Sequence, residues 1–237
     1  GNGDAEQLPG AINRLGDLGL GGDDDMETGR TSTLNADNPM ADFFAWVTDI
    51  KSRMATFKRN CERIEHKHAE TLTSIKGGGG EELESLIDET QEIAQNIRNQ
   101  LKKMDEQTKQ SKKLTSAEQR IRTNMHNALT RKFVELMSSY QAGQQRFKTG
   151  YKERMERQYR IVNPTATPQE VAAIVDGDQD PGAIFQSAQL SLGMSAARNA
   201  VADIKEKHKE IQKLEQSIVE LHQLFVDMSV MVEQQGE

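Results

Sequence analysis

The sequence predicts an all-α protein, in which an antiparallel three-helix bundle is followed by a linker and a long fourth helix that can fold back to make a four-helix closed form. Apolar residues recur at alternating steps of three and four along four long stretches, the spacing of one helix face. Glycine and proline gather between these stretches, where helices end. The composition agrees, because 28% of residues are charged and 5% aromatic, as in exposed bundles rather than compact α/β enzymes.

The first helix is expected to begin at Asn38 as its N-cap, with Pro39 in the first turn, and to run to about Ile75. Four glycines at 77–80 then end it. Residues 1–36 are rich in Gly, Asp and Asn and predict a disordered tail. The helix carries an apolar stripe of Phe43, Val47, Ile50, Met54, Phe57, Cys61, Ile64 and His68.

Two further helices complete the predicted bundle. One begins around Glu81, and its lysines near 102–113 are interleaved with acidic residues, which favours a solvated face over a phosphate or lipid site. The next begins at Ser116, which forms a capping-box pattern with Gln119. Its apolar face extends to Tyr159. Prolines and glycines then predict a linker, in which residues 169–175 are expected to form one or two helical turns.

The fourth helix is expected to start near Ser195 and contains the most regular apolar pattern in the chain. Steps of three and four alternate there without a slip, which predicts the a/d seam of a coiled coil. The seam comprises Ile211, Leu214, Ile218, Leu221, Phe225, Met228 and Val232. The next step lands on Gln235, and a polar residue at a core position fixes register at a cost in stability.

The seam and its ending VEQQGE resemble the core motif of the syntaxins, the Qa class of SNARE proteins. RKFVELMSSY at 131–140 and FFAWV at 43–47 resemble the third and first helices of that family's N-terminal three-helix (Habc) domain. The likeness spans residues 38–237. It implies that Gln235 is the ionic-layer residue of a four-helix bundle that drives membrane fusion, and that Ile211 to Val232 supply the seven apolar layers before it.

The resemblance also implies a domain order. Residues 1–36 would be the tail, 37–162 the Habc regulatory domain and 163–194 the linker. Residues 195–237 would be the N-terminal half of the SNARE motif. The second half of the motif and a membrane anchor are expected beyond Glu237, so this stretch itself is expected to be soluble.

In the neuronal syntaxins, a Leu-Glu pair in the linker helps to hold the core helix against the N-terminal domain. The matching positions here are Val171 and Ala172. An apolar residue therefore still occupies the first position, but the second has no acidic side chain. Ile184 and Phe185 match the same linker and are expected apolar anchors of the closed state. We therefore expect a seam hidden in the closed state, but a free protein that opens more readily than the neuronal syntaxins.

The implied partners are an SM (Sec1-related) protein that favours the closed state, a synaptobrevin-type R-SNARE and other Q-SNARE helices. The implied location is the cytosolic face of a target membrane, the plasma membrane, reached through the anchor that lies outside this chain. The implied role is vesicle exocytosis.

No pattern predicts an enzyme, a cofactor or a metal site. None of the five histidines lies four residues from another, and Cys61 lies on an apolar stripe, as a core residue does. A net charge of −7 does not favour nucleic-acid binding, and no apolar run approaches the roughly 18 residues that span a bilayer. The alternative is a helical scaffold or adaptor without a fusion role, which explains four amphipathic helices but not the Gln on the seam.

Overall fold

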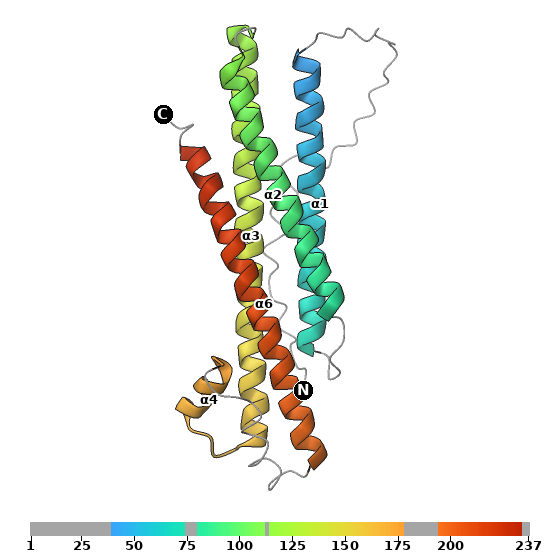
Figure 1. Ribbon diagram of the computed structural model, residues 1–237, viewed down its shortest axis with the longest axis vertical. Coiled ribbons are helices and arrows are strands. Elements are labelled where there is room, and N and C mark those ends of the chain that lie inside the picture. The colour runs from blue at the N-terminus through green and yellow to red at the C-terminus, as the bar shows by residue number, and fades with distance from the viewer. Residues whose placement is uncertain (1–38, 74–79, 112–113, 178–193, 234–237) are drawn as a thin grey trace, which may run out of the picture. The chain divides into compact units, whose positions relative to one another are not determined.

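The computed structural model of the chain describes residues 39–73, 80–111, 114–177 and 194–233, and every regular element in these ranges is a helix. The elements are α1 (Pro39–Thr73), α2 (Gly80–Gln110), α3 (Ser116–Val162), α4 (Pro168–Val175) and α6 (Met194–Glu233). Figure 1 shows α1, α2 and α3 running in alternating directions, with α6 folded back along α3. The predicted all-α fold with a fourth helix against the bundle is confirmed.

The helix boundaries lie close to those expected from the sequence. Helix α1 ends at Thr73, ahead of the glycine run, and its expected N-cap, Asn38, lies outside the described residues. The short helix predicted inside the linker exists as α4, with Pro168 in its first turn. Helix α6 begins at Met194, one residue before the expected start.

The capping box predicted at Ser116 and Gln119 is wrong by one residue. The N-cap of α3 is Thr115, whose hydroxyl accepts a hydrogen bond from the Glu118 backbone N–H at 3.3 Å. The Glu118 carboxylate accepts one in return from the Thr115 backbone N–H at 2.8 Å, and the bonds to Thr115 lower the pKa of Glu118. A carboxylate accepts more strongly than an amide and suits the positive end of the helix dipole, so it displaces Gln119 from this role.

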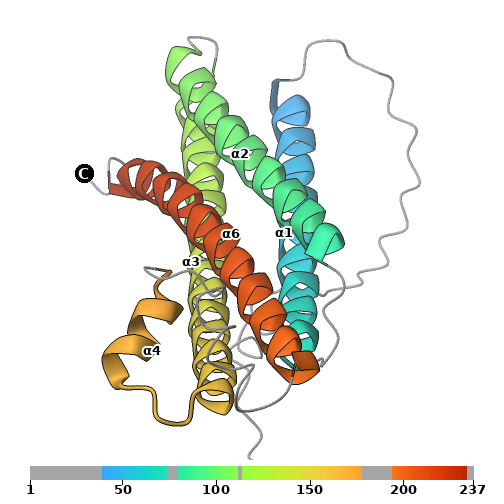
Figure 2. The ribbon, with the colours of Figure 1, turned by 60° about the horizontal axis from the view of Figure 1, so that its bottom comes forward.

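Two apolar clusters form the core, and α6 contributes to both. The first lies between α1, α2, the first half of α3 and the C-terminal half of α6, where Phe57 packs edge-on against Phe133 and Tyr140 with ring centroids 5.7 Å apart. The second lies between the last part of α3, the linker helix α4 and the N-terminal half of α6. Figure 2 shows α4 beside α3. Because α6 completes both clusters, its docking is part of the fold.

Replacing Thr115 with alanine is expected to lower the free energy of unfolding by about 1 kcal/mol, because the first-turn N–H of α3 loses its acceptor. The measurement is urea denaturation followed by circular dichroism. The matched control is Thr167→Ala, which removes the same box from the short helix α4. This control is expected to lower the urea midpoint of unfolding less than Thr115→Ala does. Equal losses of stability in the two variants would contradict this expectation.

Candidate functional site

The candidate site is the face of α6 that meets the bundle. Four of the seven predicted seam residues are fully buried there: Ile211, Leu214, Leu221 and Met228, each 3% exposed or less. The other three within the described residues, Ile218, Phe225 and Val232, are only half-buried. The structure therefore brings the predicted seam to one interface but does not hide all of it.

The buried face of α6 changes along the helix. With Ile211 taken as heptad position a, the N-terminal half buries its a and d positions from Ile204 to Leu214, and also Glu210 at a g position. The C-terminal half buries d and g positions instead, since Ser217 is 1% and Leu224 8% exposed. The expectation that the closed form hides the whole seam is thus wrong. The C-terminal half contacts α2 as well as α3, and the groove between two helices takes in the g side of α6.

The linker residues expected to stabilise the closed form differ in their surroundings. Val171 is 5% exposed and belongs to the second cluster, together with Ile174. The side chain of Ala172 is exposed. Ile184, Phe185 and Gln235 lie outside the described residues, so their expected roles stay predictions.

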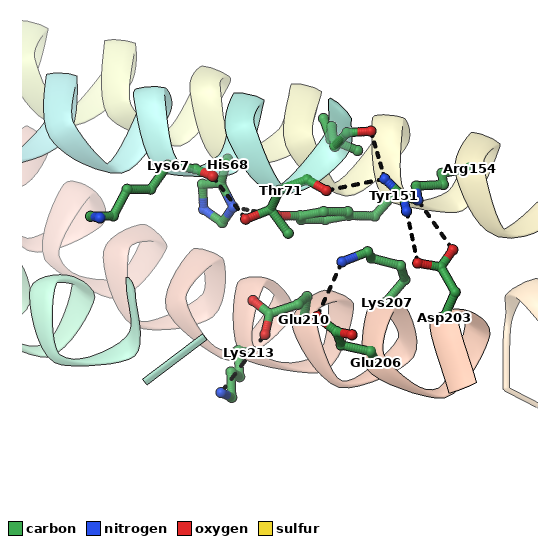
Figure 3. A network of polar contacts seen from close by, with 11 residues as sticks. Lys67, His68, Thr71, Tyr151, Arg154, Asp203, Glu206, Lys207, Glu210 and Lys213 are labelled. Carbon is green, nitrogen blue, oxygen red and sulfur yellow. Dashed lines mark hydrogen bonds and ion pairs between the residues drawn. The ribbon is translucent and has the colours of Figure 1, made fainter. Parts of the chain in front are cut away.

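One ion pair joins α6 to two bundle helices at once (Figure 3). Arg154 of α3 meets the Asp203 carboxylate of α6 through two hydrogen bonds of 2.8 and 3.1 Å, and both side chains are less than one-fifth exposed. The same guanidinium donates to the carbonyl oxygens of Thr71 and Leu72, at 3.1 and 2.7 Å. These carbonyls lie in the last turn of α1, which leaves them without partners inside their own helix. Arg154 therefore ties α1, α3 and α6 together.

A second set of polar side chains lies next to this pair, within the second cluster (Figure 3). His68 of α1 is fully buried, and its Nδ1 is 2.8 Å from the hydroxyl oxygen of Tyr151 on α3. From α6, the buried Lys207 places its Nζ 5.8 Å from the centroid of the Tyr151 ring and 3.4 Å from the Glu206 carboxylate. Burial raises the pKa of the neighbouring Glu210, against the opposing effect of Lys213 and Lys207. The N-terminal half of α6 thus docks through charged as well as apolar groups.

The two apolar clusters are separated by buried polar groups. Gln144 of α3 and Ser217 of α6 lie between the clusters, beside Tyr140 at the end of the first cluster, and we call these three residues the polar break. Burial raises the pKa of Tyr140, and the nearby Gln144 and Ser217 side chains oppose this rise, but no hydrogen bond of good geometry joins the three among the described residues. Buried polar groups without good partners cost free energy. The centre of the α6 interface is therefore polar, between two apolar parts.

Three further ion pairs border the α6 interface. Glu215 binds Lys148 of α3, Lys213 binds Glu84 of α2, and Asp227 binds Arg98 of α2, at 2.7, 2.7 and 2.6 Å. All six side chains keep at least one-fifth of their surface exposed, so each pair contributes little to stability. Their effect is to favour this placement of α6 over others.

Three charged residues of this interface were not predicted from the sequence: Arg154, Asp203 and Lys207. A signal for Lys207 exists, because the 3-4 repeat extended backward from Ile211 lands on it and then on Ile204. A charged residue on an apolar seam indicates a specific partner across the interface. The partner of Asp203 has no such signal, since Arg154 is one of many charged residues on α3.

The described residues show little that bears on chemistry or membrane insertion. No three His, Cys, Asp or Glu side chains among them gather as metal ligands, and none of the described helices is long and apolar enough to cross a membrane. Cys61 packs against the first cluster, and burial raises its pKa, so the thiol is a poor nucleophile.

Replacing Asp203 with asparagine is expected to loosen the N-terminal half of α6, because Arg154 is left charged and largely buried without its carboxylate. The cost is about 3 kcal/mol, or roughly a hundredfold loss of amide protection between residues 200 and 214 in hydrogen exchange. The matched control is Asp176→Asn, which removes the exposed partner of Lys152. Protection of α6 that falls equally in both variants would rule out a special role for the Arg154–Asp203 pair.

Acid is expected to destabilise the closed bundle through His68. Burial lowers the pKa of His68 from 6.5 to about 4, so between these values the unfolded chain binds a proton that the folded chain does not. Stability therefore falls as the pH drops from 6.5 toward 4, by at most about 3 kcal/mol. Urea midpoints at pH 7.5 and 5 measure this effect.

The control for this prediction is His68→Gln, since other groups titrate in the same range. Burial lowers the pKa of His126 as well, and the raised pKa of Glu210 acts with the opposite sign. The difference between wild type and variant isolates His68. If the variant loses as much stability as the wild type on acidification, His68 is not the responsible group.

Comparisons with known proteins agree with this geometry. The family model described as Syntaxin matches residues 37–188, and the model described as SNARE domain matches residues 202–237, which include the seam. A chain of the crystal structure of the Unc18–syntaxin 1 complex from Monosiga brevicollis is similar to this one, with a TM-score of 0.67 and 28% sequence identity. The match covers 86% of this chain and 87% of that chain. With its bundle, its folded-back helix and its seam, the chain belongs to the syntaxin family.

Proposed function

We propose that this chain is a Qa-SNARE of vesicle exocytosis, which assembles with partner SNARE helices to drive membrane fusion. The observation that carries the proposal is the seam of α6, because it lies in the residues matched by the SNARE domain and is mostly buried against the chain's own bundle. The same side chains cannot be buried in two places at once. Assembly therefore requires α6 to leave the bundle.

The free energy for this exchange comes from apolar burial. Each large apolar side chain removed from water is worth roughly 1.5 to 3 kcal/mol, so seven layers provide a driving force well above thermal energy. The bundle already buries four of the seven, which lowers the net gain and makes the closed form a barrier to assembly. A partner shifts the balance only by its difference in affinity for the two states.

The domain roles follow from this competition. Residues 37–162 form the regulatory Habc domain, 163–194 the linker, and 195–237 the first half of the SNARE motif with Gln235 at its ionic layer. The tail at 1–36 precedes them. Partners are a synaptobrevin-type R-SNARE and other Q-SNARE helices, at the cytosolic face of the plasma membrane.

An SM (Sec1-related) protein is the proposed regulator of the closed form. The similar structure from Monosiga brevicollis is a complex of Unc18 with syntaxin 1, which supports a partner of this class. The exposed Ala172 stands where a Leu-Glu pair would supply an acid, so the free protein depends on this partner for much of its closure.

The test compares two neighbouring residues, one buried in the closed form and the other predicted to be a layer of the assembled SNARE bundle. Leu224 is buried in the closed form at a g position, whereas Phe225 is half-buried there but is a predicted layer. Leu224→Gln is expected to loosen α6 and to raise the rate of assembly with synaptobrevin-type and other Q-SNARE helices about tenfold. Phe225→Gln is expected to weaken the assembled complex, because it removes an apolar layer from the new bundle.

Fluorescence anisotropy of a labelled synaptobrevin-type helix gives the assembly rate, and circular dichroism gives the gain in helix. Mixtures that gain no helix, even with Leu224→Gln, would favour the scaffold interpretation over the SNARE one. Equal effects of the two substitutions would contradict the assignment of Phe225 as a layer residue.

A further inference from the structure

The most exposed positions in the C-terminal half of α6 are uncharged, while Glu220 and Asp227 keep only part of their surface exposed. Between residues 216 and 230, the most exposed residues are Gln216, Val219, His222, Gln223, Val226 and Val230. The preceding part of the helix differs, because it exposes Arg198, Lys205, Lys209 and Glu215. In a chain with 28% charged residues, six exposed positions without a charge in one part of a helix require a reason.

Three valines dominate this surface. Val219, Val226 and Val230 are 68%, 40% and 45% exposed, and they make up half of the six large apolar side chains exposed in the described part of the chain. At 100° per residue they lie within about 40° of one another around the helix axis. The half-buried a residues Ile218 and Phe225 precede Val219 and Val226 in the sequence and lie about 80–140° from the valines around the axis. We call these five residues the valine ridge.

The C-terminal half of α6 is thus apolar over more of its circumference than the bundle covers. A helix with so wide an apolar surface is normally covered on two sides, and the bundle covers only the d and g side. Interface cores are depleted of charged residues, as this ridge is. Both observations favour a second neighbour that binds α6 while the first is still in place.

The periodicity of the ridge indicates the kind of neighbour. Residues 218 and 225, and likewise 219 and 226, are seven apart, and the ridge from 218 to 230 runs about 18 Å along the helix axis. This is three turns of a heptad stripe, which matches the apolar face of another long helix. The ridge is also continuous with the a positions of the seam in the matched SNARE domain.

We propose that the valine ridge is a docking surface for the helix of a partner SNARE, and that it is used while α6 is still folded against the bundle. The partner helix first covers the a residues Ile218 and Phe225 and the valines at b and f positions, which the closed form leaves accessible. The d and g side stays on the bundle until α6 is released. This inference rests on the proposed function, and it adds a bound state that precedes opening.

The test holds α6 closed. Cysteines at 98 and 227 replace the paired Arg98 and Asp227 in a Cys61→Ala background, and a short bismaleimide links them. Labelled peptides of a synaptobrevin-type SNARE domain and of a partner Q-SNARE domain are titrated separately against the linked protein by fluorescence anisotropy. At least one peptide is expected to bind the linked protein.

Two double variants of the linked protein localise that binding. Val219→Lys with Val226→Lys is expected to weaken it by about tenfold or more, because two apolar contacts become charged. The matched control is Gln216→Lys with Gln223→Lys, which adds the same charge to exposed glutamines, and it is expected to weaken binding less than about threefold. Equal losses in the two variants would overturn the proposal, since repulsion alone would then explain them.

The unlinked protein separates this proposal from the proposed function. If the unlinked protein assembles with both peptides but the linked protein binds neither, the ridge is not a docking surface and the SNARE function stands. If neither form binds any peptide, both proposals are overturned.

Discussion

The packing of α6 against α3 is the contact on which the rest of this structure depends. Helix α3 has 47 residues, while α1 has 35 and α2 31, and its C-terminal part carries Tyr151, Met155 and Tyr159. These large side chains are buried mainly by the N-terminal half of α6 and by the linker helix. Without α6 they would face water, so the bundle and the folded-back helix stabilise one another.

The polar groups at this contact give it specificity more than strength. The Arg154–Asp203 pair and the buried Lys207 fix the position of α6, but removing charges from water largely offsets what they gain in attraction. The polar break adds buried atoms without partners. A purely apolar interface of the same size would bind α6 more tightly, but it would specify the position of α6 along the bundle less well. Under the proposed function, α6 later leaves for another bundle, and an interface of this kind suits such a helix.

Much of the fold could be predicted from the sequence, because helix faces, breaks and the linker helix follow from local spacing. The seam from Ile211 to Met228 is equally local. What the sequence could not show is which side of that seam the bundle covers, since burial of Ser217 and Leu224 depends on the groove between α2 and α3. The Arg154–Asp203 pair is missed for the same reason, as it joins residues 49 apart that no spacing rule connects.

Release of the C-terminal half of α6 from the bundle exposes a different amount of apolar surface than release of the N-terminal half. The C-terminal half adds Leu221, Leu224 and Met228 to a cluster that α1, α2 and α3 largely build themselves, so its departure leaves most of that core intact. The N-terminal half is tied to the linker: Gly177, at φ +84°, lies against the His208 ring of α6 so closely that a Cβ there would clash. Release of the N-terminal half therefore also uncovers Val171 and Ile174 on α4. Opening from the C-terminal end exposes less apolar surface at its first step, and that is the end where the valine ridge lies.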